Sequence, residues 1–305
     1  MKSRRPKVLH RAAGRSLLAH VIRAVMPLEP DLTVVVVGFG AEQVRSEFQA
    51  DDLTFVQQAE QLGTGHALRM TEEVVTPTLG TLLVLNGDGP LLSSVTLERL
   101  VESQRGRDGM TLLTCEVKEP KGYGRVVRSR SGAVARIVEE KDATEKERGI
   151  REINPGIYAF DQTVFSKVHR LTNANAAGEY YITDLVDCYL RSGSEVRAIS
   201  VADEQQVLGV NDRKHLALAE RILGDRVRDR WLSEGVTMVS PEQTFIDETV
   251  QLDYDIVLEP GVVLKGETRI GAGACVGAYC HLTDCVVDPG VVVPPHTVKE
   301  SAVLS

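Results

Sequence analysis

A polar, glycine-containing segment in the first quarter of the sequence has residue types that suit a nucleotide base. It covers residues 57–67 and reads QQAEQLGTGHA. Its glycines allow the backbone to approach a ligand closely, and the helix expected after it would favour negative charge at its start. Amide side chains carry a donor beside an acceptor, which fits the edge of a base. The residues alone leave a second interpretation open, a polar connection between a strand and a helix.

A second polar segment, residues 86–90, directly follows an apolar run and reads NGDGP. In open α/β sheets, ligands bind beyond the carboxyl ends of the strands. Magnesium combines a few protein oxygens with phosphate oxygens. Asp88 is therefore a candidate to hold Mg²⁺ on a phosphate, and an ordinary Asp-Gly turn is the alternative.

Five further short segments combine glycine with acidic, amide or aromatic residues. They are GYGR (122–125), EEKD (139–142), EINPG (152–156), GEYYITD (178–184) and GVND (209–212). Taken singly, each is compatible with turn chemistry. Their order and spacing, together with the two segments above, carry the functional argument.

The elements expected around these segments alternate between strands and helices. Apolar runs predict strands at 33–37, 53–57, 81–85, 110–117 and 195–201, and those at 33–37 and 81–85 are expected to be buried. Helices are expected at 94–104 and 180–193, an antiparallel hairpin at 124–141, and one further strand at 153–160. This alternation predicts an α/β fold with a mixed, mostly parallel sheet covered on both faces.

The last quarter of the chain repeats at an interval of six residues. The aliphatic positions of the repeat are Leu252, Leu258, Leu264, Ile270, Val276 and Leu282. A period of six predicts a short left-handed parallel β-helix of hexapeptide repeats, in which these side chains point inward, with about three coils over 250–305. A long charged helix is expected before it. The predicted domains are therefore 1–211, a linker helix at 212–234, and a β-helix at 235–305.

Composition narrows the class of protein. The 305 residues carry a formal net charge of -8, which argues against broad nucleic-acid binding. No apolar run is long enough for a membrane helix, and the basic N-terminus leads into no signal-peptide core. Three of the five cysteines are spaced five residues apart, at Cys275, Cys280 and Cys285, unlike the close pairs of metal sites. We therefore expect a cytoplasmic protein without nucleic-acid or membrane partners.

The ordered motifs resemble one family, the bifunctional N-acetylglucosamine-1-phosphate uridyltransferase/glucosamine-1-phosphate acetyltransferases (GlmU-type). The resemblance covers essentially the whole chain. It rests on PKVLH (6–10), QAEQLGTGHA (58–67), GDGP (87–90), GYGR (122–125), EEKDA (139–143), EINPG (152–156), GEYYITD (178–184) and GVND (209–212), followed by the hexads. It implies a Rossmann-like nucleotidyltransferase domain, a linking helix and a left-handed β-helix that forms a homotrimer.

The resemblance also implies roles for single residues. Asp88 and Asn211 would hold one Mg²⁺ between the UTP phosphates and the sugar phosphate, and Lys7 would bind phosphate. The uracil-binding residues would be Gln58, Gly63 and Thr64. The residues that bind N-acetylglucosamine would be Gly124, Glu139 and Asn154. Asn86 belongs to the substrate-binding set as well, although Asn86, Gly89 and Pro155 depart from the residues usual in the family. His66 is expected to be structural.

The implied reaction is uridylyl transfer from UTP to N-acetylglucosamine-1-phosphate, in which positioning and charge neutralisation supply most of the rate. The resemblance also implies that this sequence begins after the family's first strand and glycine-rich loop, and ends before the coils needed for acetyl transfer. We therefore expect little uridyltransferase and no acetyltransferase activity from these 305 residues. Two alternatives stay open: a non-catalytic trimerising protein, and a nucleotidyltransferase for another sugar-1-phosphate.

Overall fold

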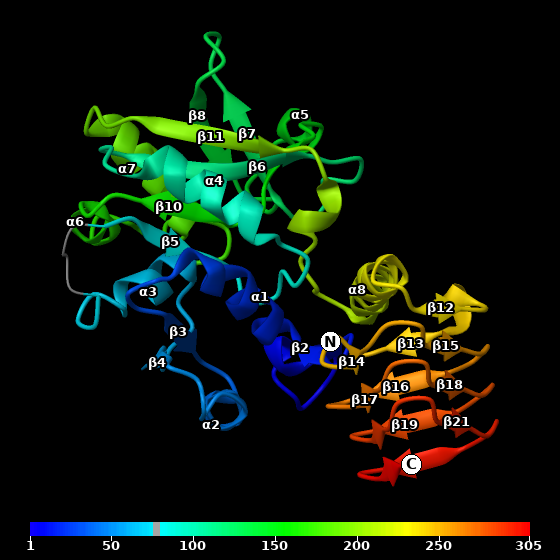
Figure 1. The fold of residues 1–305 in the computed structure, drawn as a ribbon. Helices are drawn as coiled ribbons and strands as arrows, with labels where there is room; N and C mark the ends of the chain where they lie inside the picture. Colours follow the sequence, from blue (N-terminus) through cyan, green and yellow to red (C-terminus); the bar gives the residue numbers. More distant parts are fainter. Residues whose placement is uncertain (76–79) are drawn as a thin grey trace. The chain divides into compact units, whose positions relative to one another are not determined.

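The structure of the protein is a computed structural model, which describes residues 1–75 and 80–305. It divides into two compact units. The α/β unit comprises Lys2–Leu9 and His20–Gly209, and the β-helix unit comprises Met1, His10–Ala19 and Val210–Ser305. Figure 1 follows the chain through both units. Within the described ranges, no helix combines the length and apolar character needed to cross a membrane.

The α/β unit alternates strands and helices, as the sequence predicts. Its strands are β3 (Val34–Val37), β4 (Thr54–Gln57), β5 (Leu82–Val84), β6 (Met110–Glu116), β7 (Gly124–Arg128), β8 (Val134–Val138), β9 (Glu152–Asn154), β10 (Tyr158–Phe160) and β11 (Val196–Val201). Its helices are α2 (Ala41–Glu47), α3 (Thr64–Arg69), α4 (Ser94–Gln104), α5 (Glu145–Arg148), α6 (Val164–Val168) and α7 (Leu185–Arg191), and α1 (Leu17–Val25) is shared with the β-helix unit.

Seven strands form one mixed sheet, in the order β5-β10-β6-β9-β7-β8, with β11 also paired to β6. The mixed α/β fold is therefore confirmed. Strands β5, β6 and β11 run in one direction, because β10 lies antiparallel between β5 and β6 and β11 is parallel to β6. The ladders from β6 to β9 and through the β7–β8 hairpin are antiparallel. The sequence predicts a mostly parallel sheet. Three strands do run in the same direction, but most neighbouring strands of this sheet pair antiparallel.

The prediction of a single strand over 153–160 is wrong. Pro155 and Gly156 divide this segment into β9 and β10. Pro155 has no N–H to donate to a ladder, and Gly156 has a φ of +79°, in the left-handed region that side chains rarely adopt. Strand β9 consequently pairs with β6 and β7, whereas β10 pairs with β5 and β6.

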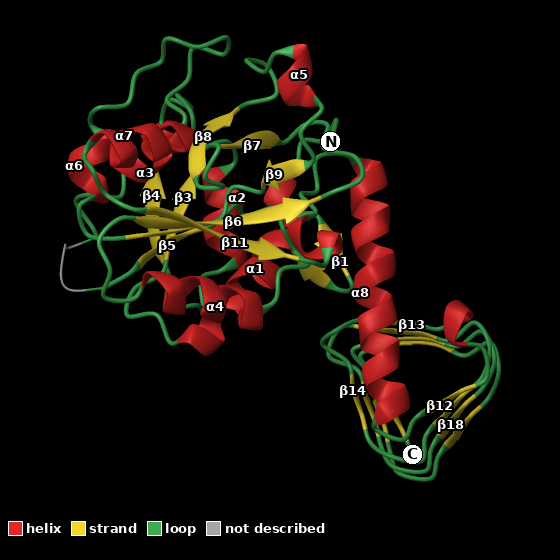
Figure 2. Ribbon diagram, turned by 90° about the horizontal axis from the view of Figure 1, so that it is seen from above, coloured by secondary structure: helices red, strands yellow, loops and turns green. Residues whose placement is uncertain are grey.

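The centre of the α/β core is β6, whose side chains alternate between two helical layers. Leu112 packs in a cluster with residues of α6 and α7, and Leu113 packs in a cluster with residues of α4. Figure 2 shows α4 on one face of the sheet and α6 and α7 on the other. Both leucines are 0% exposed, so this strand is buried on both faces, as its continuous apolar sequence predicts.

Strands β3 and β5 are less buried than predicted. Strands β3 and β4 form a separate two-stranded parallel sheet. Within β3, Val34, Val35 and Val36 are half-buried and Val37 is buried, and all three residues of β5 are half-buried. The expectation of full burial for these strands is wrong, because fewer elements cover them than cover β6.

The β-helix consists of three parallel sheets, which form its three faces. The first contains β12 (Thr237–Met238), β15 (Val257–Leu258), β18 (Cys275–Val276) and β21 (Val292–Val293). The second contains β13 (Phe245–Ile246), β16 (Val263–Lys265), β19 (His281–Thr283) and β22 (Val298–Glu300). The third contains β14 (Gln251–Leu252), β17 (Arg269–Ile270), β20 (Val286–Val287) and β23 (Val303–Leu304). This arrangement confirms the β-helix, and β12 and β13 extend it upstream of residue 250.

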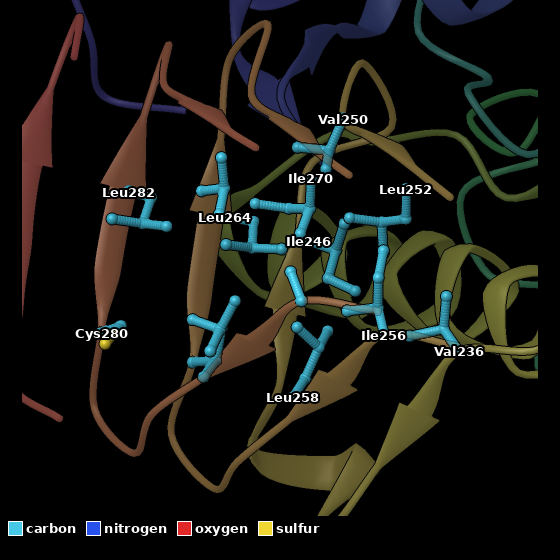
Figure 3. Packing of buried hydrophobic residues seen from close by; sticks show 14 of the residues in the cluster. Val236, Ile246, Val250, Leu252, Ile256, Leu258, Leu264, Ile270, Cys280 and Leu282 are labelled. Carbon is cyan, nitrogen blue, oxygen red and sulfur yellow. The ribbon is translucent and has the colours of Figure 1, made fainter. Parts of the chain in front are cut away.

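The hexad positions point into the β-helix, as the period of six predicts. Figure 3 shows Leu252, Leu258, Leu264, Ile270 and Leu282 gathered in its interior. All five lie in one buried cluster. Each coil is covered by its neighbours above and below, so strands of two or three residues suffice to bury their inward side chains.

Helix α8 (Arg213–Ser233) coincides with the long charged helix predicted from the sequence. It begins at Asp212, whose Oδ1 accepts a hydrogen bond from the His215 N–H at 2.8 Å. Its Val227 and Trp231 pack in the same buried cluster as the β-helix interior. A short hairpin of β1 (Arg11–Ala12) and β2 (Arg15–Ser16) belongs to the same unit. Helix α8 is therefore a packed part of the β-helix unit.

Candidate functional site

The candidates for base binding lie between β4 and α3. The Gln58 side chain is 8% exposed, and its Nε2 donates to the Gly63 carbonyl oxygen at 3.0 Å. The same Nε2 lies 3.0 Å from Nδ1 of His66. Gly63 has a φ of +106°, and a Cβ at this position would collide with the Tyr180 carbonyl oxygen. The structure thus brings Gln58 and Gly63 together and adds His66 to them.

A segment distant in sequence fixes this loop from the other side. The Tyr180 N–H donates to the Leu62 carbonyl at 2.8 Å, and the Gly65 N–H donates to the Tyr180 carbonyl at 2.7 Å. The Thr64 hydroxyl accepts from the Ile182 N–H at 3.1 Å. The two sequence motifs QAEQLGTGHA and GEYYITD are therefore in direct contact.

The candidates for sugar binding form a second cluster. Gly124 on β7 and Asn154 on β9 are paired in the sheet. Glu139 follows β8, and a Cβ at Gly124 would lie 3.5 Å from its Oε1. The Thr183 hydroxyl donates to Glu139 Oε1 at 3.0 Å. Asn154 Nδ2 donates to the Tyr158 hydroxyl at 2.6 Å. All three residues inferred from the resemblance lie together here.

Glu139 is the main acceptor of this cluster. Burial raises its pKa, the hydrogen bond from Thr183 lowers it in part, and the negative charges of Asp184 and Asp142 raise it further. Within the described ranges, its Oε2 makes no hydrogen bond. A half-buried carboxylate with one oxygen held by the protein and the other available is suited to accept a hydrogen bond from a ligand hydroxyl.

The candidates for phosphate and metal binding lie beyond the carboxyl end of β5. Lys7 Nζ and Asp88 Oδ2 are 2.5 Å apart, and the Asp88 side chain is 16% exposed. Asn86 Nδ2 donates to the Pro155 carbonyl at 3.1 Å. Lys7 and Asp88 are thus brought together, and Asn86 contacts the segment that carries Asn154.

The second magnesium ligand inferred from the resemblance, Asn211, is exposed and belongs to the β-helix unit. Its convergence with Asp88 stays a prediction. Within residues 1–75 and 80–305, no three His, Cys, Asp or Glu side chains are grouped closely enough to hold a metal. The donor chemistry at Asp88 nevertheless suits Mg²⁺, because carboxylate oxygens are its preferred protein ligands and Mg²⁺ binds few of them when phosphates supply further oxygens.

A continuous series of contacts joins these candidates within the α/β unit. Residues 180–183 contact the base-binding loop through Tyr180 and Ile182, and contact Glu139 through Thr183. From there the series continues through the sheet to Asn154 and through Pro155 to Asn86. These candidates of the α/β unit are therefore one connected group of residues.

Sequence reasoning missed several residues that hold the candidate residues and their loops in place. Thr183 and Tyr158 each bond a candidate residue directly. The Tyr123 hydroxyl donates to the Val207 carbonyl and accepts from the Gly209 N–H, both at 3.3 Å. Most of these residues lie inside or next to motifs visible in the sequence, but nothing in the sequence indicates which distant group each contacts.

The Gly122–Gly124 turn is held by an ion pair between a buried arginine and a half-buried glutamate, which the sequence did not reveal. Arg125 is 1% exposed, and its Nη2 lies 2.7 Å from Glu140 Oε2. The same oxygen accepts the Gly122 N–H at 3.1 Å. Although desolvation acts in the opposite direction, the bonds from Arg125 and Gly122 lower the pKa of Glu140. Glu140 thus stays ionised and anchors the turn beside the sugar-binding candidates.

Comparisons with known proteins show what the chain is similar to. The profile of the nucleotidyl transferase family matches residues 2–219. A protein of Thermus thermophilus named "Bifunctional protein GlmU" is 45% identical over 303 residues, which cover 99% of this chain and 66% of that protein. Its namesake of Thermobifida fusca is 46% identical over 312 residues, covering 100% of this chain and 64% of that protein. The namesake of Enterococcus faecalis is 39% identical over 305 residues, covering 99% and 66%.

The chain therefore spans slightly less than two thirds of the length of these relatives. Their similarity extends over both units, because it covers nearly every residue of the chain. The resemblance inferred from the motifs is confirmed.

Proposed function

Because this chain belongs to the nucleotidyl transferase family, we propose that it transfers a uridylyl group from UTP to N-acetylglucosamine-1-phosphate, releasing pyrophosphate. The observation that carries the proposal is the contact of residues 180–183 with both Thr64 and Glu139. It joins a loop suited to a base to a cluster suited to a sugar, which is the arrangement that formation of a nucleotide sugar needs. The product, UDP-N-acetylglucosamine, would serve peptidoglycan synthesis.

In the proposed reaction, an oxygen of the sugar phosphate attacks the α-phosphorus of UTP and pyrophosphate leaves. Two anionic reactants must be brought into line, so positioning and charge neutralisation supply most of the rate and no protein nucleophile is required. When bound, Mg²⁺ would neutralise phosphate charge and act as a Lewis acid, held by Asp88 and Asn211.

The side chains of this protein would perform the remaining work. Lys7, now paired with Asp88, carries an ammonium group that can bind a phosphate oxygen instead. Gln58 and Gly63 would hold the base. Glu139 and Asn154 would orient the sugar through hydrogen bonds to its hydroxyl and acetamido groups.

The proposal is tested by pyrophosphate release with UTP and a panel of sugar-1-phosphates, comparing the wild type with Asp88→Ala. We expect slow turnover that is fastest with N-acetylglucosamine-1-phosphate, and a loss of kcat on the order of 10² or more in the variant. UTP affinity should fall much less, because neutralisation matters most in the transition state. Unchanged turnover in Asp88→Ala would contradict the proposed role.

The same assay separates the alternatives. A nucleotidyltransferase for another sugar would turn over a different sugar-1-phosphate faster. A non-catalytic protein would show neither turnover nor calorimetric binding of UTP.

We also propose that the chain associates as a homotrimer through the β-helix. The last coil carries outward valines on each of its three faces: Val292, Val298 and Val303 are 71%, 71% and 69% exposed. Exposed aliphatic side chains on flat faces of a solenoid favour association. A monomer found by light scattering at micromolar concentration would contradict this proposal.

A further inference from the structure

The orientation of the Gln58 amide is fixed by its surroundings. Its Nε2 contacts the Gly63 carbonyl oxygen at 3.0 Å. A carbonyl oxygen only accepts hydrogen bonds, so the end of the amide that contacts it must be the NH₂ group. The chemistry of the partner thus settles an orientation that coordinates alone leave open.

His66 provides a second constraint on the same NH₂ group. Its Nδ1 lies 3.0 Å from Gln58 Nε2. The NH₂ group has two hydrogens, one of which is used by Gly63, so the second points to Nδ1. Nδ1 must therefore accept, which places the proton of the neutral ring on Nε2. Both hydrogens of the amide are then occupied by the protein.

The remaining polar atom of Gln58, its Oε1, has no hydrogen-bond partner among the residues that the structure describes. Gln58 as a whole is 8% exposed, but Oε1 is not among the buried side-chain atoms that lack a partner, so this atom remains accessible. An accessible acceptor that the protein leaves open can be paired by a donor on a ligand. Oε1 is thus set to accept a hydrogen bond from a ligand.

We propose that His66 is a positioning residue that holds the Gln58 amide with Oε1 toward the base, and that this orientation selects uracil over cytosine. The inference rests on the proposed function, because it takes UTP as the nucleotide bound. The base of UTP has a single N–H donor, at N3, which suits an acceptor. Cytosine in the same placement presents a lone pair at N3, so two acceptors would face each other and both would remain without a partner.

The test compares the wild type with His66→Leu and His66→Asn. Leucine removes the acceptor next to Gln58 Nε2, whereas the Asn side chain carries an amide oxygen that can take the place of Nδ1. Dissociation constants for UTP and for CTP are measured by calorimetry on the full chain, and KM and kcat are measured with each nucleotide. Thermal melts followed by circular dichroism establish that each variant is folded.

We expect His66→Leu to reduce the preference for UTP over CTP by roughly 3- to 10-fold, the range of one neutral hydrogen bond. The change should appear in the dissociation constant and KM, with kcat altered less than about two-fold, because the base is remote from the reacting phosphorus. His66→Asn should restore most of the preference. If His66 had a merely structural role, the variant would bind both nucleotides less by the same factor. The ratio of the two dissociation constants would then be unchanged.

The remaining outcomes contradict either this inference or the proposed function. An unchanged preference in His66→Leu, or an Asn variant no better than the Leu variant, contradicts the inference. A wild type that binds UTP and CTP equally contradicts the inference alone. A wild type that binds neither nucleotide contradicts the proposed function on which the inference rests. If His66→Leu does not fold, His66→Ala removes the same acceptor and is judged by the same ratio.

Discussion

The β-helix and the β3–β5 region of the α/β unit show opposite relations between strand length and burial. In the β-helix, Leu258, Leu264 and Leu282 are 0% exposed although their strands have only two or three residues. In the α/β unit, β3 is a continuous run of four valines, yet Val34, Val35 and Val36 are only half-buried. The hydrophobicity of a strand therefore does not decide how deeply it is buried.

The difference lies in what covers each strand. A β-helix strand has a coil on each side along most of the solenoid and a shared interior opposite its face. Strand β3 pairs with β4 alone among the described strands, and β5 pairs with β10 alone. Strand β6, with ladders on both sides and helices on both faces, reaches the burial of the β-helix within the same unit as β3.

The largest expected effect compares the two regions directly. Leu264→Ala in the β-helix should lower the free energy of unfolding by about 2–5 kcal/mol, because it leaves a cavity in a fully covered core. Val35→Ala on β3 should cost about 1 kcal/mol or less, because its side chain is already half in water. Urea denaturation followed by circular dichroism measures both. Equal losses in the two variants would break the comparison.

The next prediction concerns a buried polar pair beside the site of the α/β unit, in contrast to the aliphatic hexad side chains of the β-helix. Tyr158 is 1% exposed and its hydroxyl accepts from Asn154 at 2.6 Å. Tyr158→Phe leaves the Asn154 amide without this partner and should cost about 1–3 kcal/mol. The same denaturation measures the loss. A neutral effect would show that water replaces the hydroxyl and that the contact adds little to the site.

Because Glu139 is a half-buried acid, the stability of the folded protein should depend on pH. Burial, opposed in part by Thr183, raises its pKa, so the folded state favours the protonated carboxyl. The stability that this preference contributes is present below the ordinary pKa of glutamate and is lost as pH rises through the raised pKa. We expect Glu139→Gln to flatten the dependence of the denaturation midpoint on pH in that window.

The matched control for this prediction is Glu102→Gln on α4, where the side chain is 64% exposed. It should leave the pH profile unchanged. If both variants flatten the profile equally, burial of Glu139 is not the cause.

The smallest effect is expected at a surface ion pair of the α/β unit. Arg191 and Asp187 lie 2.8 Å apart on α7, with side chains 80% and 51% exposed. Asp187→Ala should change stability by no more than about 0.5 kcal/mol, because solvent screens exposed charges. A loss as large as that of Tyr158→Phe would show that contacts at the surface of this unit matter as much as its buried ones.

Much of the fold could be predicted because its signals are local. Helix α4 covers the predicted 94–104, since Ser93 accepts from the Thr96 N–H and caps it. The hexads predicted the β-helix because each coil repeats the same inward position. The break at Pro155 and Gly156 was missed because apolar residues resume directly after it, at Ile157, and favour a single strand.

The sequence predicted which residues belong to the candidate site, but it did not predict the hydrogen bonds that join them. The ordered motifs indicated Gln58, Glu139 and Asn154, and the structure places the last two together beside Gly124. The bonds from Thr183 to Glu139 and from Ile182 to Thr64 join residues far apart in the chain. Such pairs depend on how the sheet and its loops are assembled, which no single segment of sequence encodes.

The position of Trp231 gives this chain a built-in optical probe. It is the single tryptophan of the sequence, is 8% exposed, and has the Arg230 guanidinium 4.4 Å above its ring. Because it packs with the β-helix interior, fluorescence excited where tyrosine does not absorb reports the melting of that unit alone. Five of the seven tyrosines, by contrast, lie in the α/β unit and dominate tyrosine emission, whereas only Tyr254 and Tyr279 belong to the β-helix unit. Recording both emissions during one thermal ramp would therefore show whether the two units unfold in a single transition or in two.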